Sequence, residues 1–559
     1  MVSRNRRFFF VFAIHYYQAN SGGIGLQLPS FAAAWIPLTI SLGLACWQIS
    51  AAGTLRYTNL SKMLSFCIVA LFLPFLFGKS NVDISVDRFL AVIAIFLFFL
   101  ALQQFKFSAR QLLLLPLFII IGVWVEALYG WWQFITGLIS ERSLTGLQTR
   151  PYGIFQQVNV MASFMATGLV LSAYMLGKDS ATQTPKIVRL LYLGMPLVTV
   201  HLLHALASRA GWLGAVTGLI FVLPYVWKNA DRKLLLIWCV TLTVGFSLSW
   251  LVVPATGWSA SEKEIISLQS VRSLTMPQTI DMIMDKPLTG YGYGNFESSY
   301  LHYTAEKHAG DPNYPPGFPS LSHPHNELLF WATEGGIIAL AGLLAAAILV
   351  WRRVYQNEIW TRLALVGLFL PIVLHTQLEL PFYQSTAHLI IFVILIYWVD
   401  NLTADYKEKP LKSTLLIGMF GLLVPIVTSL FVVTTLQSGR LLTKYESGNL
   451  DNVEDLEKMT NSVVWQDRLN WTIRSKLVIN GILSGQPQLG QGYIDWIPGQ
   501  LAREPRVRFY QYLILAHQAL GNAAEVTAVQ AEADYLFPDE SFEITDISSI
   551  IAKPVSVSE

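Results

Sequence analysis

Two histidines stand at the end of a long hydrophilic segment, immediately before an apolar stretch of chain. They lie in the run Ser-His-Pro-His-Asn-Glu at 322–327, and residues 328–351 are apolar enough to cross a bilayer. Histidine takes up and releases a proton near neutral pH, so an imidazole at such a position is a candidate general base. At this point a plain helix-capping role for His323 and His325 stays open as the alternative.

Two arginines are candidates for binding a negatively charged group. Arg209 lies in the run Ser-Arg-Ala-Gly-Trp at the outer end of two closely spaced apolar segments, where a charge usually faces a cavity or a partner. Arg272 precedes the run Pro-Leu-Thr-Gly-Tyr-Gly-Tyr-Gly at 287–294. Snorkelling of Arg209 to lipid head groups and simple solvation of Arg272 are the alternatives. Guanidinium groups pair bidentately with phosphate oxygens, which favours a phosphate-bearing substrate.

Amides and a tyrosine complete the set of polar candidates. Gln156, Gln157 and Asn159 lie just before or at the start of an apolar segment, where capping of a helix is the alternative role. Tyr383 lies in the run Glu-Leu-Pro-Phe-Tyr-Gln at 379–384, a short turn after His375, where an interfacial aromatic belt is the alternative.

The composition defines the elements that must position these groups. Of 559 residues, 53% are hydrophobic and 13% are charged, whereas soluble proteins carry about 25% charged residues. We therefore predict an all-α polytopic membrane protein with about 13 crossings, each of about 20 apolar residues. The predicted spans are 8–20, which is short and weak, 30–50, 62–78, 86–103, 111–136, 158–176, 187–206, 210–228, 233–253, 326–351, 362–378, 384–399 and 413–436.

Basic residues alternate between the connections and so predict the orientation. They concentrate in every second loop, which is the pattern of cytoplasmic loops. With a cytoplasmic N-terminus and an odd number of spans, residues 254–325 and the C-terminal region are both exported. All the polar candidates then lie on that exported side.

The two large exported segments differ in character. The segment 254–325 is rich in proline and glycine, which predicts a structured loop, such as a lid with one or two helices. In the C-terminal region, Tyr510, Leu513, Ile514 and His517 recur at helical spacing before a Gly-Asn turn. This helix–turn–helix pattern resembles a tetratricopeptide unit and predicts a small helical, TPR-like domain that could bind a protein.

Several kinds of chemistry lack a sequence signature here. The chain has no Gly-x-x-x-x-Gly-Lys-Ser/Thr loop, no His-Glu-x-x-His and no Asp-x-Asp-like pair, so no cofactor, nucleotide or metal is expected. Cys46, Cys67 and Cys239 all fall in apolar stretches, so the long hydrophilic segments contain no cysteine, and neither a disulfide framework nor a zinc site is expected there. The basic residues are dispersed, which gives no indication of nucleic-acid binding.

The motifs together resemble the O-antigen ligase/polymerase superfamily, and specifically bacterial PglL-type protein O-oligosaccharyltransferases. The resemblance rests first on His325-Asn326 followed about ten residues later by Gly335-Gly336. It rests further on Arg209 in a Ser-Arg-x-Gly-Trp-like setting and on Arg272 before the Gly-x-Gly-x-Gly run. Residues 150–164 and 380–385 resemble blocks of the protein-glycosylating branch, as does the exported tail. Ala339 departs from the small or polar residue usual in the ligases.

The resemblance implies a function and a division of the chain. It implies transfer of a preassembled oligosaccharide from undecaprenyl diphosphate to Ser or Thr of a periplasmic acceptor protein such as a pilin, by an enzyme of the bacterial inner membrane. We expect N-terminal transmembrane helices at 1–253, a periplasmic loop with catalytic residues at 254–325, C-terminal transmembrane helices at 326–436 and a periplasmic helical domain at 437–559.

The resemblance also implies roles for the candidate residues. Arg209 and Arg272 would bind the diphosphate, and His325 would act as general base, with His323 as the weaker candidate. Asn326 would fix the imidazole, and Gln156, Gln157, Asn159 and Tyr383 would orient the glycan or the acceptor. An O-antigen ligase acting on lipid A core and a Wzy-type polymerase remain alternatives, and a transporter is a more distant one because the polar residues gather at one face.

Overall fold

The computed structural model describes residues 15–544 except 78–79, 140–149, 183, 256–261, 449 and 451–452. In this part of the chain, twelve helices are long and apolar enough to cross a membrane. They are α2 (Pro29–Ala52), α3 (Asn59–Phe72) continued by η2 (Leu73–Leu76), α4 (Val82–Gln104), α5 (Ala109–Leu112) with α6 (Leu114–Ile139), α8 (Val158–Thr182), α9 (Lys186–Leu206), α10 (Arg209–Asn229), α11 (Arg232–Ala255), α14 (Glu327–Tyr355), α15 (Ile359–Thr376), α17 (Thr386–Thr403) and α18 (Leu415–Glu446).

The all-α polytopic fold predicted from the sequence is confirmed, with the last twelve predicted spans present. The first predicted span, 8–20, lies mainly outside the described residues, and residues 15–20 are not helical. Most predicted boundaries agree within four residues, but α18 continues ten residues beyond the predicted end at 436. It does so because the turns after Leu436 pack against the segment that follows: Ser438 Oγ accepts the N–H of Asn461 at 3.0 Å, and Gly439 packs against the Trp465 ring.

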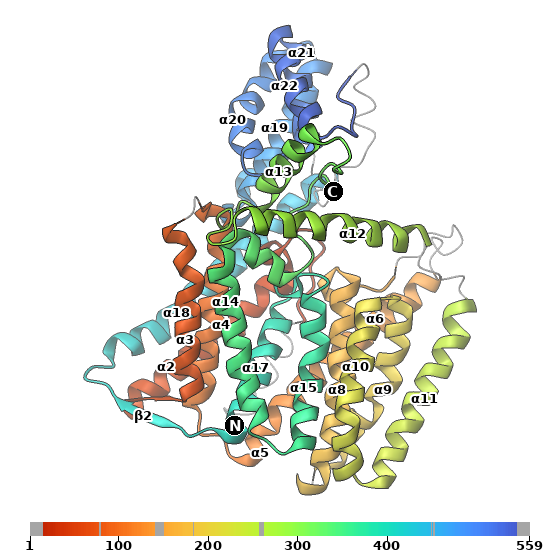
Figure 1. The fold of residues 1–559 in the computed structure, drawn as a ribbon, viewed down its shortest axis with the longest axis vertical. Helices are drawn as coiled ribbons and strands as arrows, with labels where there is room; N and C mark the ends of the chain where they lie inside the picture. Colours follow the sequence, from red (N-terminus) through yellow and green to blue (C-terminus); the bar gives the residue numbers. More distant parts are fainter. Residues whose placement is uncertain are drawn as a thin grey trace.

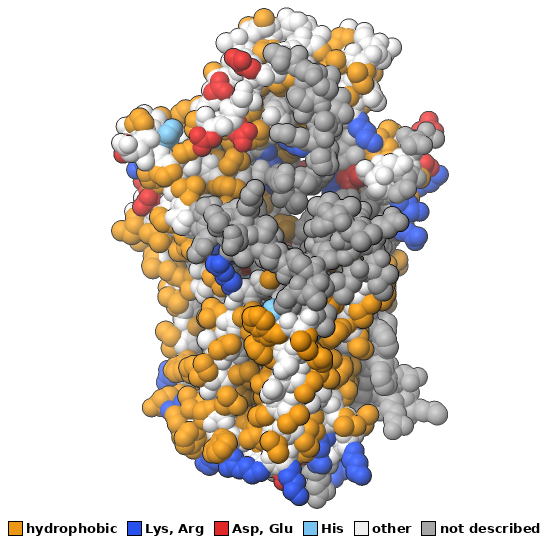
Figure 2. Space-filling model, turned by 90° about the vertical axis from the view of Figure 1, so that its right-hand side faces the viewer, with side chains coloured by type: hydrophobic (Ala, Val, Ile, Leu, Met, Phe, Trp, Pro, Cys, Tyr) orange, Lys and Arg blue, Asp and Glu red, His pale blue; other side chains and the backbone are white. Residues whose placement is uncertain are grey.

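The two ends of the bundle differ, and we name them by what they carry. The loop face carries the segment between α11 and α14 together with the C-terminal helices, and the sheet face carries β1 (Thr54–Tyr57), which pairs with β2 (Lys407–Pro410). Figure 2 shows a broad hydrophobic band around the bundle and a concentration of Lys and Arg at the sheet face. The loop and the C-terminal region therefore share one side, as the alternation of spans predicted.

Helix α8 is the centre of the bundle. Its apolar window is entirely buried, and it contacts α9, α10 and α15. Helices α10 and α15 approach closely through glycine: Gly214 packs against Pro371, and Gly218 packs against the backbone of Gly367. This antiparallel register places the N-terminal end of α10 level with the C-terminal end of α15 at the loop face.

Helix α14 is broken near the loop face by a glycine pair. Gly336 has φ +65° and ψ −165°, which interrupts the helix, and the carbonyls of Thr333 and Glu334 accept the N–H groups of Tyr291 and Gly292 at 2.9 Å each. A Cβ at position 336 would meet the Leu288 carbonyl, so only glycine fits this contact. The two glycine motifs of the sequence therefore pack against each other.

The loop-face elements form one body above the bundle (Figure 1). Helix α12 (Glu262–Asp285) lies across the loop face, and α13 (Phe296–Gly310) packs against the C-terminal helices, which matches the predicted loop with helices. The C-terminal helices are α19 (Gln466–Leu483), α20 (Gln491–Leu501), α21 (Val507–Ala519) and α22 (Ala523–Leu536). The predicted turn between the last two holds Gly521 at φ +74°.

Short elements complete the described chain. They are the 3-10 turns η1 (Gly25–Gln27), η3 (Gly153–Phe155), η4 (Val453–Lys458), η5 (Val463–Trp465) and η6 (Pro487–Gly490), and the single-turn helix α16 (Pro381–Gln384) between α15 and α17. Helix α16 and the residues just before it lie at the loop face. They supply the centre of the candidate site.

Candidate active site

Glu379 is the residue on which the polar groups at the loop face converge. It lies between α15 and α16, and its side chain is only 8% exposed. Its Oε1 accepts a hydrogen bond from Arg272 Nη2 of α12 at 2.6 Å, and its Oε2 is 2.9 Å from His325 Nδ1. One buried carboxylate therefore joins two of the predicted catalytic residues, Arg272 and His325, which lie 53 residues apart (325 − 272) in the sequence.

The turn before α14 aims His325 at this carboxylate. His325 has φ +52°, a left-handed conformation that is costly for a residue other than glycine and is typically retained where function requires it. Its backbone N–H donates to His323 Nδ1 at 3.2 Å, and the two rings lie 4.7 Å apart. The two histidines thus face each other across a tight turn.

Asn326 fixes the end of this turn. It is the N-cap of α14: its Oδ1 accepts the N–H of Leu329 at 3.0 Å. Its Nδ2 donates to the carbonyl of Gln377 at 3.1 Å. Asn326 therefore ties the start of α14 to the residues after α15, and it positions the backbone from which His325 projects rather than the ring itself.

Electrostatics define the protonation of the pair. Burial acts to raise the pKa of Glu379, but the hydrogen bond from His325 and the electrostatic effects of His325, His323 and Arg272 outweigh it and lower this pKa to about 2. An ionised carboxylate only accepts hydrogen bonds. The shared proton therefore belongs to His325 Nδ1, and in the neutral imidazole the lone pair is on Nε2. This is the tautomer that a general base needs.

His323 has a different environment from its neighbour. Burial, with smaller contributions from His325 and Arg272 that exceed the opposing effect of Glu379, lowers its pKa to about 4. It is therefore neutral near pH 7. Within the described part of the chain, one ring nitrogen from each of His323 and His325 and one oxygen of Glu379 lie within 4.8 Å of one another, an arrangement that could hold a metal ion.

A buried hydrogen-bonded chain supports Glu379 from below. The Glu379 N–H donates to the carbonyl of His375 in α15. His375 Nδ1 and His388 Nε2 both contact Ser163 Oγ, at 2.7 and 2.9 Å, and His388 Nδ1 contacts Ser385 Oγ at 2.9 Å. Helices α15, α8 and α17 are thereby locked together directly beneath the site.

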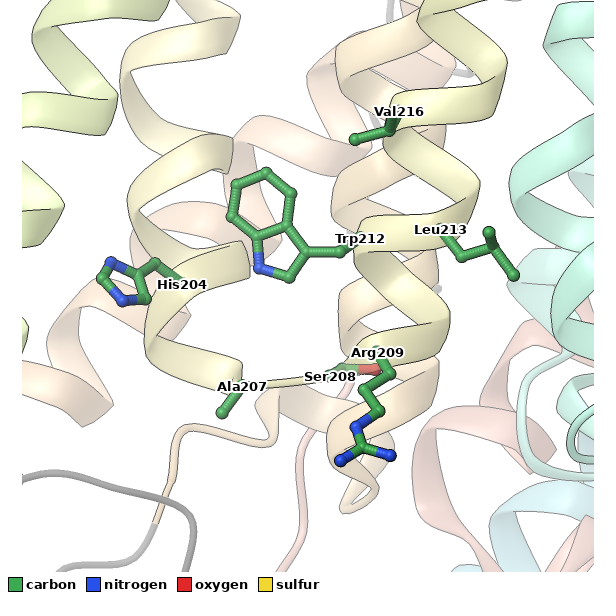
Figure 3. Close-up of a pocket in the computed structure, with 7 residues that line it drawn as sticks. All are labelled: His204, Ala207, Ser208, Arg209, Trp212, Leu213 and Val216. Atoms are coloured by element: carbon green, nitrogen blue, oxygen red, sulfur yellow. The ribbon is translucent and has the colours of Figure 1, made fainter. Parts of the chain in front are cut away.

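Arg209 lies at the same face but in a cavity of its own. It begins α10, and it borders a cavity of about 480 Å³ lined by His204, Ala207, Ser208, Trp212, Leu213 and Val216. Figure 3 shows Trp212 pointing toward α9 and His204, and the Arg209 guanidinium extending beyond the start of the helix. Among the contacts of the described residues, none joins Arg209 to Arg272, Glu379 or His325. The structure therefore places Arg209 beside the Glu379 centre without a direct contact.

Asn159 positions the start of that helix. Its Oδ1 accepts from Ser208 Oγ at 2.7 Å, and Ser208 Oγ in turn accepts the N–H of Gly211 at 3.2 Å as the N-cap of α10. Gln157 Oε1 accepts the N–H of Val160 at 2.8 Å at the beginning of α8. Gln157 therefore caps α8, the alternative considered for these amides, whereas Asn159 contacts the Ser208 cap of α10 from within α8.

Gln156 occupies a strained position in a tightly held turn. Its φ is +56°, and the preceding residues are fixed by side chains from α6: Gln133 Oε1 accepts the N–H of Gly153 at 2.8 Å, and Glu126 Oε1 accepts the N–H of Ile154 at 2.9 Å. Gly153 is required because a Cβ there would overlap the Glu126 carboxylate. The segment is therefore a rigid turn that leads into α8.

Tyr383 points into the protein rather than to lipid. Its hydroxyl is 3.4 Å from Glu327 Oε1, which also accepts from Trp331 Nε1 at 2.7 Å. Burial, and then the neighbouring Glu327 carboxylate, raises its pKa well above the usual value. Tyr383 is thus part of a buried layer next to the His-Asn turn, which disagrees with the interfacial-belt alternative.

Two features of the site were not chosen from the sequence. Glu379 begins the run 379–384, in which only Tyr383 was a candidate from the sequence. A carboxylate next to this aromatic run was the signal that could have identified it. Arg88, in the second turn of α4, pairs with Glu334 at 2.5 Å. An arginine inside a predicted span usually has a partner, which was a usable signal for this pair.

The fold and this centre define a polytopic membrane protein with an enzyme-like site beneath a helical loop. Residues 151–176 match the family model described as protein glycosylation ligase, residues 197–344 match O-antigen ligase, and residues 363–548 match virulence factor membrane-bound polymerase, C-terminal. The chain is a PglL-type member of the O-antigen ligase superfamily, and the resemblance seen in the motifs is confirmed. No curated protein matches the chain. The ligase models indicate an enzyme that transfers glycans.

Proposed function

We propose that the chain is a protein O-oligosaccharyltransferase of the bacterial inner membrane. It transfers a preassembled oligosaccharide from undecaprenyl diphosphate to a Ser or Thr hydroxyl of a periplasmic, pilin-like protein, and its loop face is the periplasmic face. The observation that carries the proposal is the convergence of Arg272 and His325 on Glu379 at this face, in a chain whose residues 151–176 match the protein glycosylation ligase model.

The arrangement supports a direct displacement at the first sugar. The acceptor oxygen attacks the anomeric carbon as its proton passes to His325 Nε2, and the bond from the anomeric carbon to the phosphate oxygen breaks. A general base of this kind contributes about 10²–10⁴-fold. Glu379 holds Nδ1–H at 2.9 Å and stabilises the imidazolium that forms.

The departing undecaprenyl diphosphate carries the negative charge that develops in this step. Arg272 is 26% exposed, so its remaining N–H groups are available to the diphosphate while one N–H stays on Glu379. Arg209 reaches the same membrane level from the neighbouring cavity. Positioned donors at developing charge are usually the largest contribution to catalysis.

The remaining predicted residues take supporting roles in this proposal. Asn326 positions His325 through the cap that it forms, and Asn159 positions Arg209 through its contact with the Ser208 cap. Tyr383, His323, Gln156 and Gln157 orient glycan or acceptor. The C-terminal helices, packed on α13, bind the acceptor protein.

The test is glycosylation in a bacterium that supplies a lipid-linked glycan and a pilin acceptor. We expect wild type to glycosylate the acceptor, and His325→Ala and Arg272→Ala to lose at least about a hundredfold of the transfer rate. His302→Ala is the matched control, because His302 lies on α13 and is exposed. If both site variants insert stably and still modify the acceptor, the proposal is wrong.

A second candidate is ligation of the glycan to lipid A core, which the match of residues 197–344 to the O-antigen ligase model favours. The same experiment separates the two. A ligase leaves the pilin unmodified and adds glycan to lipopolysaccharide, whereas a polymerase lengthens the glycan on its lipid carrier.

A further inference from the structure

We infer that His323, His325 and Glu379 form an inhibitory zinc site that competes with catalysis. The binding of the ion stands on the geometry alone, whereas its effect on transfer rests on the proposed function. The site would take a divalent ion that favours imidazole nitrogen, of which Zn²⁺ is the biological example.

The donor set fits this ion. Two imidazoles and one carboxylate are a common three-ligand set for Zn²⁺, with a solvent molecule as the fourth ligand. Mg²⁺ and Ca²⁺ require mainly oxygen ligands and do not fit. The two histidines are separated by one residue, and Glu379 comes from a different connection, so the set is assembled by the fold.

The distances require only small side-chain movements. In a tetrahedral site with bonds of 2.0–2.1 Å, the ligand atoms lie about 3.4 Å apart. His325 Nδ1 and Glu379 Oε2 are now 2.9 Å apart, and all three donor atoms lie within 4.8 Å of one another. The first pair must therefore open by about half an ångström, and the separations that involve His323 must close by up to about 1.4 Å.

The surroundings of the carboxylate are compatible with a ligand role. Glu379 Oε1 is held by Arg272 at 2.6 Å, and ligating carboxylates are usually fixed by a hydrogen bond of this kind. Oε2 can then bind the ion without losing the contact with Arg272. The left-handed turn at His325, with φ +52°, brings one ring nitrogen of each histidine within 4.8 Å of the Glu379 carboxylate.

Occupation of the site removes the general base whichever nitrogen binds. If His325 binds through Nε2, the lone pair that accepts the acceptor proton is consumed. If it binds through Nδ1, the single proton of the neutral ring moves to Nε2, which then donates instead of accepting. No oxidation or proton release is needed, and a chelator reverses the effect.

The binding test uses the full chain in detergent without a polyhistidine tag and with Cys46, Cys67 and Cys239 replaced by serine. Co²⁺ is the spectroscopic probe for the Zn²⁺ site. We expect one equivalent of Co²⁺ to give visible absorption bands of low coordination number, which Zn²⁺ abolishes. His323→Ala and Glu379→Gln should each weaken binding roughly tenfold or more, whereas His302→Ala, the matched control on α13, should bind as wild type does.

The second arm measures glycan transfer in the same preparation. We expect Zn²⁺ to slow the wild-type enzyme over the concentration range in which it displaces Co²⁺, and a chelator to restore the rate. Absence of the visible bands in wild type, or equal loss of binding in His302→Ala, overturns the site. Zinc binding without slower transfer overturns the inhibition. If no condition gives transfer, the proposed function fails while the binding result stands.

Discussion

Two arginine–glutamate pairs near the loop face use the same chemistry for different purposes. Arg88 and Glu334 are 9% and 1% exposed, whereas Arg272 and Glu379 are 26% and 8% exposed. The oxygens of Glu334 are taken up by Arg88 and by the backbone N–H groups of Gly294 and Phe296. Those of Glu379 are shared between two partly exposed side chains, Arg272 and His325.

The difference lies in what each carboxylate holds. Glu334 fastens the glycine-rich loop to the broken turn of α14, and the Arg88 guanidinium lies 4.3 Å from the centre of the Phe330 ring. Because both charges are enclosed, this pair is part of the architecture. Glu379 instead holds Arg272 and His325, which are both partly exposed. These two side chains can therefore contact a substrate while they stay paired with Glu379.

The largest effect on stability is expected at the enclosed pair. Arg88→Ala leaves the Glu334 carboxylate buried without its cation, which should cost about 3–5 kcal/mol. Arg272→Ala should cost about 1 kcal/mol or less, because Arg272 is partly exposed and Glu379 keeps His325. Thermal unfolding in detergent measures both.

The matched control for this comparison is the double variant Arg88→Met with Glu334→Gln. It removes both charges and keeps an acceptor for the two backbone N–H groups, so it should recover most of the loss. Equal destabilisation by Arg88→Ala and Arg272→Ala would mean that the two pairs do not differ as described.

A pH titration tests the partly exposed pair, Arg272 with Glu379. The pKa of Glu379 falls from 4.5 in the unfolded chain to about 2 in the folded protein. A lowered carboxyl pKa contributes stability that is fully present above about pH 4.5 and is lost as the pH falls from there toward 2. The contribution is about 3 kcal/mol by the usual conversion.

The measurement is the melting temperature of wild type and Glu379→Gln between pH 2 and 6. Glu379→Gln should lose the Glu379 part of the acid dependence, while Glu306→Gln, at an exposed position of α13, should behave as wild type. An unchanged acid profile in Glu379→Gln would show that its charge is not held by Arg272 and His325.

A third pair is intermediate in exposure and should give a smaller effect than the enclosed pair. Arg506 of the C-terminal helices forms two hydrogen bonds with Glu297 of α13, at 2.9 and 3.2 Å, and the side chains are 20% and 6% exposed. A double-mutant cycle with Arg506→Ala and Glu297→Ala should give an interaction energy of roughly 1–2 kcal/mol. Additive losses in unfolding free energy would show that the C-terminal helices and α13 are not coupled through this contact.

The membrane architecture was predictable because it depends on long, one-dimensional signals. The length of the apolar segments located the twelve spans of the described residues. The alternation of basic loops placed the segment 254–325 and the C-terminal region on one side. The weak first span was the exception, since its apolar length is too short to decide. The break in α14 was not predicted, although Gly335-Gly336 and the 287–294 run were both noticed, because mutual packing of two motifs has no signature in either of them.

The site was predictable in its residue types but not in its connections. Arg272 and His325 were selected for their chemistry and are brought together, whereas Arg209 lies in a separate cavity. Glu379 was missed because an acidic residue in a short turn carries no periodic signal. Its partners, His325 and Arg272, lie 54 and 107 residues away in the sequence. The amides Gln157 and Asn159 were expected at the substrate, but Gln157 caps α8 and Asn159 contacts the Ser208 cap of α10.

The pairing of α2 with α18 has a consequence for how the bundle is assembled. The two helices meet through Gly43 and Gly421, and β1 and β2 join their sheet-face ends, yet more than 350 residues of chain separate them. During synthesis, α2 is inserted into the bilayer long before α18. Its Gly43 surface therefore stays unpaired until α18 is inserted. Pairing of α2 with α18 is therefore a late event, and premature termination anywhere before residue 415 leaves α2 without this partner.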